Sequence, residues 1–374
     1  MKVLLVGNYP QDGQESMLRF SSMMEQGLLS AGHQVRVCQP PSLAGRFCRS
    51  DSFARKWLGY VDKFAAFPAI LRSAARGVDV VHICDHSNSF YVQQVRKRPH
   101  IVTCHDMLGI RGALNETPMN RPGWTGKQLQ RLILNGLVQA QHVACVSDAT
   151  RSDLLRVTRM PDKRVSKVYN GLNYSYSPMG EKDASVRLWA LGVDPAIPFL
   201  LHVGGNSWYK NRLGVLRIFA ALRERTGKTG PKLVMVGKAW TPEMTLLVEH
   251  ARLDKEVLEI RNAANEDLRA LYSMARIMLF PSLEEGFGWP IVEAQACGCM
   301  VVTSNRSPMN EIGGAAAVYV DPEDVSGAAA TVGDLLQRED HRRETSIQNA
   351  HRFSTTGMIQ GYVGLYEKVL HERA

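Results

Sequence analysis

Short apolar runs alternate with longer stretches of helical periodicity along nearly all of this chain, and this alternation constrains its fold more than any other feature. Runs such as residues 79–83 are almost continuously apolar, which is typical of parallel strands buried on both faces. Strands that alternate with helices predict a parallel sheet flanked by helices on both sides. In the first half of the chain, strands are expected at 3–7, 34–38, 78–84, 101–106, 143–147 and 165–170, and helices at 16–31, 51–76 and 126–141.

The alternation stops at a polar, irregular stretch and then begins again at residues 199–204. A chain of 374 residues also exceeds the size at which a single hydrophobic core usually stops growing. We therefore predict an α/β protein with two doubly wound domains and a substrate cleft between them, beyond the carboxyl ends of the strands. The expected parts are a first domain at 1–173, a linker at 174–195, a second domain at 196–355, and a C-terminal helix at 356–374 that packs back on the first domain.

Composition excludes several classes of protein. Hydrophobic residues make up 45% and charged residues 22%, as in ordinary globular proteins and unlike disordered or fibrous chains. The first apolar run is too short for a signal peptide or a membrane span, and no other segment approaches the roughly 20 apolar residues that a span requires. The seven cysteines form an odd set without any Cys-x-x-Cys pair. We expect reduced thiols, no metal site and a cytoplasmic location.

Positive charge gathers in one segment of a chain whose net charge is +9. Between Pro41 and Gly77, basic residues are interleaved with aromatic ones, which favours peripheral contact with the inner face of an anionic membrane. An ordinary pair of amphipathic helices with a solvated basic side explains the same pattern, and both interpretations stay open. No recognition module for nucleic acid accompanies the segment, so no nucleic-acid partner is expected. The basic residues are Arg46, Arg49, Arg55, Lys56, Lys63, Arg72 and Arg76.

The segment from Pro281 to Glu293 is the strongest functional signal in the sequence. Pro290 suits the first turn of a helix, which leaves Glu285 in a loop and Glu293 inside the helix. Two glycines in the loop would allow a ligand close to the backbone, and the free N–H groups of the helix start favour an anion such as phosphate. The two carboxylates then serve different parts of a ligand, one of them a vicinal diol such as a nucleotide ribose. The glycines are Gly286 and Gly288.

A second loop follows the first strand of the second domain. Gly204 and Gly205 permit a close backbone approach, and Lys210 with Arg212 would supply positive charge to a diphosphate. Neither the Gly-x-Gly-x-x-Gly pattern of nicotinamide and flavin sites nor the pattern of a P-loop is present. The loop therefore predicts a phosphate site of another kind.

Polar residues also follow strands of the first domain. His105 and Asp106 end one strand, where a histidine binds a sugar hydroxyl, moves a proton or serves only structure. Gly13 lies in the loop after the first strand, either beneath a ligand or as a plain turn glycine. Asp85 and His86, with His82 shortly before them, form a cluster that matches no metal spacing and is left open as acceptor surface. They are candidates for the same edge of the sheet.

Together these motifs resemble a retaining nucleotide-sugar glycosyltransferase of family 4 with the GT-B fold, and the resemblance runs from Met1 to about residue 370. Its core is residues 271–322, with Leu-Tyr-Ser-Met-Ala-Arg, Phe-Pro-Ser-Leu-Glu-Glu-Gly-Phe-Gly-Trp-Pro, Val-Glu-Ala-Gln-Ala-Cys-Gly, Val-Thr-Ser-Asn and Val-Asp-Pro in the family's order and spacing. Residues 102–106, 146–151 and 169–173 resemble the family's first-domain segments.

The resemblance implies a role for each matching residue. Glu285 would face the donor sugar, Glu293 would hold the ribose, and Lys210 would bind the diphosphate. His105 would contact the sugar near its reacting carbon. The family needs no metal or other cofactor. The full set of implied catalytic and donor-binding residues is Gly13, His105, Gly205, Asn206, Lys210, Arg212, Glu285, Gly286, Phe287, Gly288 and Glu293.

The chain departs from the family at one binding position. An arginine usually follows the strand that ends here in Gly204, whereas this chain has Gly205 and Asn206, so phosphate binding would shift toward Arg212. The expected function is transfer of a hexose from a nucleoside-diphosphate sugar to a glycan or lipid-linked acceptor in cell-surface polysaccharide biosynthesis. GDP-mannose, UDP-glucose and UDP-N-acetylglucosamine remain open as donors. The alternatives are a non-catalytic nucleotide-sugar-binding partner of another transferase, or a GT-B-fold epimerase.

Overall fold

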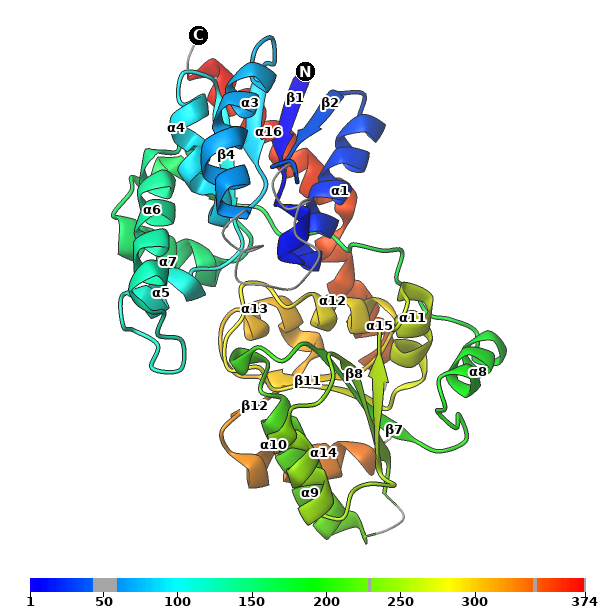
Figure 1. The fold of residues 1–374 in the computed structure, drawn as a ribbon. Helices are drawn as coiled ribbons and strands as arrows, with labels where there is room; N and C mark the ends of the chain where they lie inside the picture. Colours follow the sequence, from blue (N-terminus) through cyan, green and yellow to red (C-terminus); the bar gives the residue numbers. More distant parts are fainter. Residues whose placement is uncertain (43–58, 228–229, 339–341, 373–374) are drawn as a thin grey trace. The chain divides into compact units, whose positions relative to one another are not determined.

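A computed structural model describes residues 1–42, 59–227, 230–338 and 342–372 of the chain. The chain forms two compact units, one of Met1–Asn173 with Thr355–Ala374 and one of Tyr174–Ser354 (Figure 1). Each unit contains a six-stranded sheet in which every pairing is parallel. The prediction of an α/β protein built from two parallel sheets is confirmed.

The first unit has the strand order β2-β1-β3-β4-β5-β6. Its apolar strand residues pack with the surrounding helices in a continuous core. The strands are β1 (Lys2–Val6), β2 (Gln34–Cys38), β3 (Val80–Ile83), β4 (His100–Cys104), β5 (His142–Cys145) and β6 (Val165–Lys167). The α-helices are α1 (Glu15–Ser30), α3 (Phe67–Ala74), α4 (Val92–Val95), α5 (Leu108–Ala113), α6 (Trp124–Gln139), α7 (Asp148–Thr158) and α16 (Thr355–His371). The 3-10 helices are η1 (Pro10–Asp12), η4 (His86–Tyr91) and η5 (Asp162–Arg164), and η3 (Asp62–Ala66) is a π-helix.

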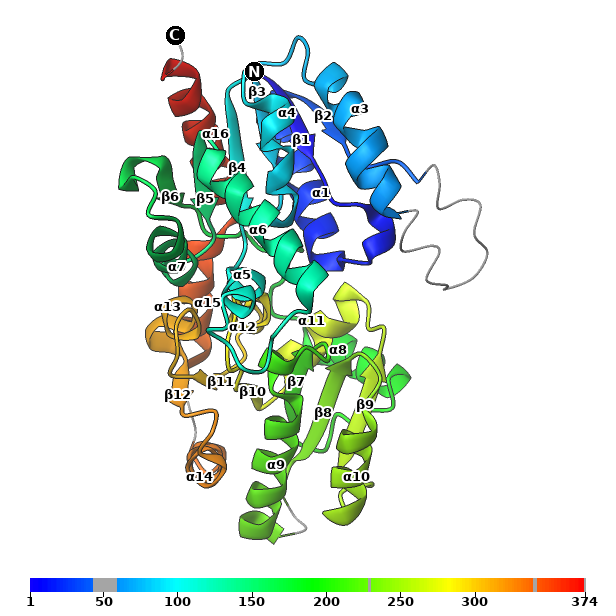
Figure 2. The same cartoon turned by 60° about the vertical axis from the view of Figure 1, so that its left-hand side comes forward.

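The second unit has the strand order β12-β11-β10-β7-β8-β9 and its own apolar core. Helices α9 and α14 pack together on one side of its sheet, and α12 packs with α15 on the other (Figures 1 and 2). The strands are β7 (Phe199–Gly204), β8 (Lys232–Gly237), β9 (Val257–Arg261), β10 (Ile277–Phe280), β11 (Val301–Ser304) and β12 (Val318–Val320). The helices are α8 (Glu181–Ala190), α9 (Arg212–Thr226), α10 (Pro242–His250), α11 (Asn265–Met274), α12 (Trp289–Ala296), α13 (Met309–Gly313), α14 (Val325–Leu336) and α15 (Arg342–Ala350), with η6 (Trp208–Lys210), η8 (Gly314–Ala316) and η9 (His351–Phe353).

Helix α8 corrects one expectation. The stretch around residues 174–194 was expected to be irregular, but α8 lies within it and packs against α11. Only Ala184 and Leu188 of this helix are buried, while Val186 and Trp189 are exposed. Such a narrow apolar stripe gives a weak helical signal in the sequence, and contact with α11 stabilises the helix.

The C-terminal helix α16 packs against α1 and β4 of the first unit. Polar groups in this packing are paired: His82 contacts the Tyr366 hydroxyl at 2.8 Å and the Thr103 hydroxyl at 2.7 Å. The Thr103 hydroxyl in turn contacts that of Tyr362 at 2.9 Å. All four side chains are completely buried. A buried polar group without a hydrogen-bond partner lowers stability. This network therefore favours a single packing position of α16 on the first unit.

The basic segment expected between 41 and 77 is described only in part. Arg46, Arg49, Arg55 and Lys56 lie outside the described residues. Of the helix expected at 51–76, the described portion contains η3 and α3, whose buried Phe67 and Leu71 join the core. Lys63 forms an ion pair with Asp12 at 2.5 Å. In the described ranges, no helix combines the length and apolarity needed to cross a membrane. Membrane contact stays a prediction.

Three fully buried histidines predict loss of stability in acid. Burial lowers the pKa of His82 to about 3, that of His142 to about 4 and that of His202 to about 3. The unfolded chain binds these protons near pH 6.5 and the folded chain does not, so stability is full above that pH and decreases as the pH falls toward the folded pKa. Each histidine should cost about 2 kcal/mol at pH 5. Chemical unfolding at pH 7.5 and pH 5 measures the loss, and equal stability at both would contradict it.

Candidate active site

In the second unit, two loops meet because their strands are neighbours in the sheet. Strand β10 pairs with β7, so the loops after them leave the same edge side by side. The Leu283 N–H donates to the Tyr209 carbonyl at 2.7 Å, and the Asn211 side chain donates to the Pro281 carbonyl at 3.0 Å. Asn211 has a φ of 52°, in the left-handed region that asparagine tolerates. The two loops are thereby held together before any ligand is considered.

An ion pair lies at the centre of these loops. The Lys210 ammonium contacts both carboxylate oxygens of Glu285, at 2.7 and 3.0 Å, and the Ser282 hydroxyl donates to the same carboxylate at 2.9 Å. The side chains of Lys210 and Glu285 are 18% and 6% exposed. Burial alone would lower the pKa of Lys210, but the charge of Glu285 outweighs it and raises that pKa above its ordinary value. Lys210 and Glu285 therefore form a mostly buried ion pair.

Helix α12 begins next to this pair as the sequence predicts, with Pro290 in its first turn. Gly288 precedes it with a φ of 100°, which a side chain would strain. Phe287 is buried against Phe353, with ring centroids 5.6 Å apart. Glu293 lies within the helix, 5% exposed, and accepts a hydrogen bond from the Tyr272 hydroxyl at 2.9 Å. Burial, and then the charge of Glu293, raises the pKa of Tyr272 well above its usual range.

Asn206 and Arg212, which were also predicted to bind phosphate, contact the loop after β8. The Asn206 amide donates to the Ala239 carbonyl at 2.7 Å, and Arg212 donates to the Lys238 carbonyl at 2.8 Å and to the Asn206 side-chain oxygen. Arg212 is 4% exposed, and burial lowers its pKa. Its Nε and Nη2 are buried with no hydrogen-bond partner within the described residues. Lys210 therefore lies with Glu285, while Asn206 and Arg212 lie toward the loop after β8.

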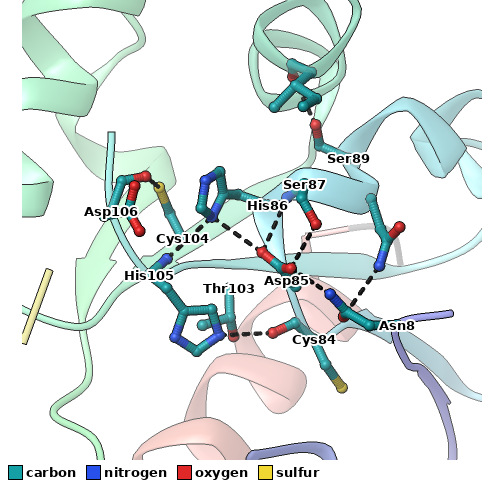
Figure 3. A network of polar contacts seen from close by, with 12 residues as sticks. Asn8, Cys84, Asp85, His86, Ser87, Ser89, Thr103, Cys104, His105 and Asp106 are labelled. Atoms are coloured by element: carbon teal, nitrogen blue, oxygen red, sulfur yellow. Dashed lines mark hydrogen bonds and ion pairs between the residues drawn. The ribbon is translucent and has the colours of Figure 1, made fainter. Parts of the chain in front are cut away.

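In the first unit, the residues after β1, β3 and β4 form a polar network (Figure 3). These strands are neighbours, so their carboxyl ends share one edge. His105 is 6% exposed and donates from Nε2 to the Cys84 carbonyl at 2.9 Å, and burial lowers its pKa. The Asp106 carboxylate accepts from the Leu108 N–H at 2.9 Å. Gly13 ends η1 with a φ of 63°, so a turn requires a glycine at that position.

Sequence reasoning missed the residues that support these groups. Ser282 and Tyr272 hold the two carboxylates, and Asn8 links the loop after β1 to Asp85 at 2.5 Å. Ser282 and Tyr272 lie in the segments Phe-Pro-Ser and Leu-Tyr, which carry the resemblance to the family. The sequence alone assigns neither residue a role. No signal marks Asn8, because its partner is distant in the chain.

Comparison with known proteins matches both halves of the chain. The family model "Glycosyltransferase Family 4" matches residues 21–176, and "Glycosyl transferases group 1" matches residues 189–352. Anabaena HepE in complex with UDP-glucose superposes with a TM-score of 0.74 at 16% identity, over 98% of this chain and 100% of that one. The two units thus have the GT-B fold of glycosyltransferases. The chain belongs to glycosyltransferase family 4.

The chain is also similar to proteins with assigned activities. The O-antigen chain mannosyltransferase B of Escherichia coli is 26% identical over 287 residues, which cover 74% of this chain and 73% of that protein. The D-inositol 3-phosphate glycosyltransferase of Mycolicibacterium smegmatis is 24% identical over 291 residues, 73% of this chain and 63% of that protein. The first name specifies mannose transfer and an O-antigen chain, and the second specifies D-inositol 3-phosphate.

The Lys210–Glu285 pair can be tested by its stability. Replacing Lys210 with Met leaves the Glu285 carboxylate mostly buried without its cation, which should lower the free energy of unfolding by about 3 kcal/mol. The double variant Lys210→Met/Glu285→Leu removes both charges and should recover most of that loss. Urea unfolding at pH 7.5 of the wild type, both single variants and the double variant measures the coupling. Additive effects of the two substitutions would show that the pair contributes nothing.

Proposed function

We propose that this glycosyltransferase moves a hexose from a nucleoside-diphosphate sugar to a glycan or lipid-linked acceptor, with retention and without a metal ion. The observation that carries the proposal is the Lys210–Glu285 pair beside the start of α12. A phosphate-sized anion needs a cation and free N–H groups, and sugar hydroxyls need a carboxylate that accepts hydrogen bonds. One small region of the second unit offers the cation, the carboxylate and the start of helix α12.

Each residue then has a part in the reaction. The bond from the sugar carbon to the diphosphate breaks, and negative charge grows on the leaving oxygen. Lys210 and the N–H groups at the start of α12 stabilise that charge, and fixed groups do so without reorganisation during the reaction. Glu285 accepts hydrogen bonds from the sugar hydroxyls, and Glu293 accepts them from the ribose diol. His105 of the first unit contacts the sugar near its reacting carbon. Arg212 supplies further positive charge if its loop opens toward the phosphates.

No single residue of this chain identifies the base or the sugar of the donor. The E. coli relative is named a mannosyltransferase, whereas HepE was solved with UDP-glucose. GDP-mannose, UDP-glucose and UDP-N-acetylglucosamine are therefore all candidates. By the same reasoning the O-antigen relative supports a role in cell-surface polysaccharide synthesis.

A thermal-shift screen tests donor binding directly. Purified protein is heated with GDP, UDP and their sugars, first with EDTA and then with magnesium, since a ligand of the native state raises the melting temperature. We expect one nucleotide family to raise it by the same amount in both conditions. A shift that requires magnesium would overturn metal independence. No shift with any nucleotide would contradict the donor site proposed for the second unit.

Two carboxylate variants test the division of labour. Glu285→Gln should reduce sugar transfer by at least about 100-fold while the nucleotide Kd stays within about tenfold, because its contacts form mainly with the reacting sugar. Glu293→Ala should instead weaken nucleotide binding, measured by calorimetric titration. Glu284→Gln, a neighbouring carboxylate with no assigned role, is the matched control. Equal loss of nucleotide binding in the first two variants would contradict the assignment.

A further inference from the structure

Helix α6 of the first unit presents large apolar side chains to solvent. The helix lies along the outside of that unit (Figures 1 and 2). An α-helix turns by about 100° per residue, so Trp124, Leu132 and Val138 lie on the side opposite its buried residues. The exposed fractions of these three side chains are 74%, 47% and 40%. The buried residues of the helix are Ile133, Gly136 and Leu137.

The loop between α5 and α6 adds two more exposed apolar side chains. Leu114 and Met119 are 47% and 64% exposed. The Asn120 side chain donates to the carbonyl of the first residue of α5 at 3.2 Å. The Lys127 ammonium donates to the Asn115 side chain at 3.2 Å, which joins the loop to α6. The loop is therefore fixed to both helices, and its apolar side chains stay in water although the loop is folded.

The charged residues that accompany these apolar side chains are all basic. Residues 117–147 contain no aspartate or glutamate, whereas Arg121, Lys127 and Arg131 supply three positive charges. Three of the elements that pack on α6, namely η4, α4 and α5, also lack carboxylates. The α6 surface, as we name it, consists of Leu114, Met119, Arg121, Trp124, Lys127, Arg131, Leu132 and Val138.

The carboxylates that flank the α6 surface in the chain or lie on the neighbouring helix α7 are ion-paired. Each of them has a basic partner of its own, so the three positive charges of the α6 surface are not offset. The pairs are Glu116–Arg156 at 2.7 Å, Asp153–Arg111 at 3.3 Å and Asp148–Lys167 at 2.6 Å.

This combination of charge and apolarity favours a lipid surface over other partners. A soluble polyanion would bind the cations but would leave the apolar side chains in water. A second copy of the chain, in a two-fold contact, would bring the same three cations to face one another, which is unfavourable. A bilayer with anionic lipid satisfies both kinds of side chain, because tryptophan suits the headgroup level and basic side chains attract lipid phosphates.

We propose that the α6 surface docks on an anionic lipid membrane. Trp124 and the other apolar side chains enter the boundary between headgroups and acyl chains, and the three cations contact lipid phosphates. The α6 surface shares no residue with the basic segment between 41 and 77, so this contact is separate from the one expected there. It does not depend on the proposed sugar transfer, because membrane binding requires neither donor nor acceptor.

Cosedimentation of the full chain with vesicles tests the proposal. The vesicles contain phosphatidylcholine alone or with about one third phosphatidylglycerol, and we expect the wild type to bind the anionic vesicles more tightly. Arg121→Gln/Arg131→Gln should weaken that binding at least about tenfold, since each cation near the lipid contributes about fivefold. Trp124→Ser should weaken it about tenfold through lost apolar contact. The matched controls Arg225→Gln and Trp189→Ser, at exposed positions of the second unit, should bind as the wild type does.

Fluorescence quenching tests whether Trp124 enters the bilayer. Bromine atoms on lipid acyl chains quench only a tryptophan that comes close to them. Brominated anionic vesicles should therefore quench the fluorescence of the wild type. Trp124→Phe should lose most of this quenching and keep most of the vesicle binding, because phenylalanine remains apolar.

Three results would overturn the inference. The first is a wild type that does not bind anionic vesicles, and the second is unchanged binding in both Arg121→Gln/Arg131→Gln and Trp124→Ser. The third is a wild-type dimer that Trp124→Ser dissociates in analytical ultracentrifugation, which would assign the α6 surface to a second copy of the chain. Melting temperature and nucleotide binding should be the same in every variant as in the wild type, so a failure of the proposed donor site would be recognised separately.

Discussion

Pairing between strands that are not consecutive in the chain determines both candidate sites. In the second unit β7 pairs with β10, although β8 and β9 come between them in the sequence. That pairing places Lys210, after β7, against Glu285, after β10. In the first unit β3 lies between β1 and β4, so the loops bearing Asn8, Asp85 and His105 gather at one edge. Parallel strands all end on the same side of a sheet, which is why each edge collects polar loops.

Buried polar groups at these edges are mostly paired, and the pairing positions them before a substrate arrives. Asp85 is surrounded by hydrogen-bond donors, and Glu293 is held by Tyr272. Groups locked by neighbours need little reorganisation when they meet a ligand, which favours catalysis. Arg212 differs, because two of its nitrogens are buried without partners within the described residues. An unsatisfied charged group of this kind is costly, so a polar ligand or water that reached it would be bound strongly.

Local signals in the sequence were reliable where one residue dictates the backbone. Pro290 correctly predicted that α12 begins there, leaving Glu285 in a loop and Glu293 in a helix. The apolar runs located the strands to within a few residues, because continuous apolarity is the mark of a strand buried on both faces. Helix α8 was missed, since its narrow buried stripe is stabilised by α11 and not by its own sequence. The roles of Ser282 and Tyr272 were missed for the same reason, because each is defined by a partner.

The sequence by itself therefore determined the class of fold, the restart of the βα series after residue 195, and the residue types available for phosphate and sugar. These follow from short-range periodicity and from motifs that are contiguous in the chain. Only the tertiary structure decided that Lys210 pairs with Glu285, that Arg212 turns toward the loop after β8, and that His86 lies between Asp85 and His105. Strand order and side-chain direction set those contacts, and both depend on residues far apart in the sequence, whose energies no local pattern records.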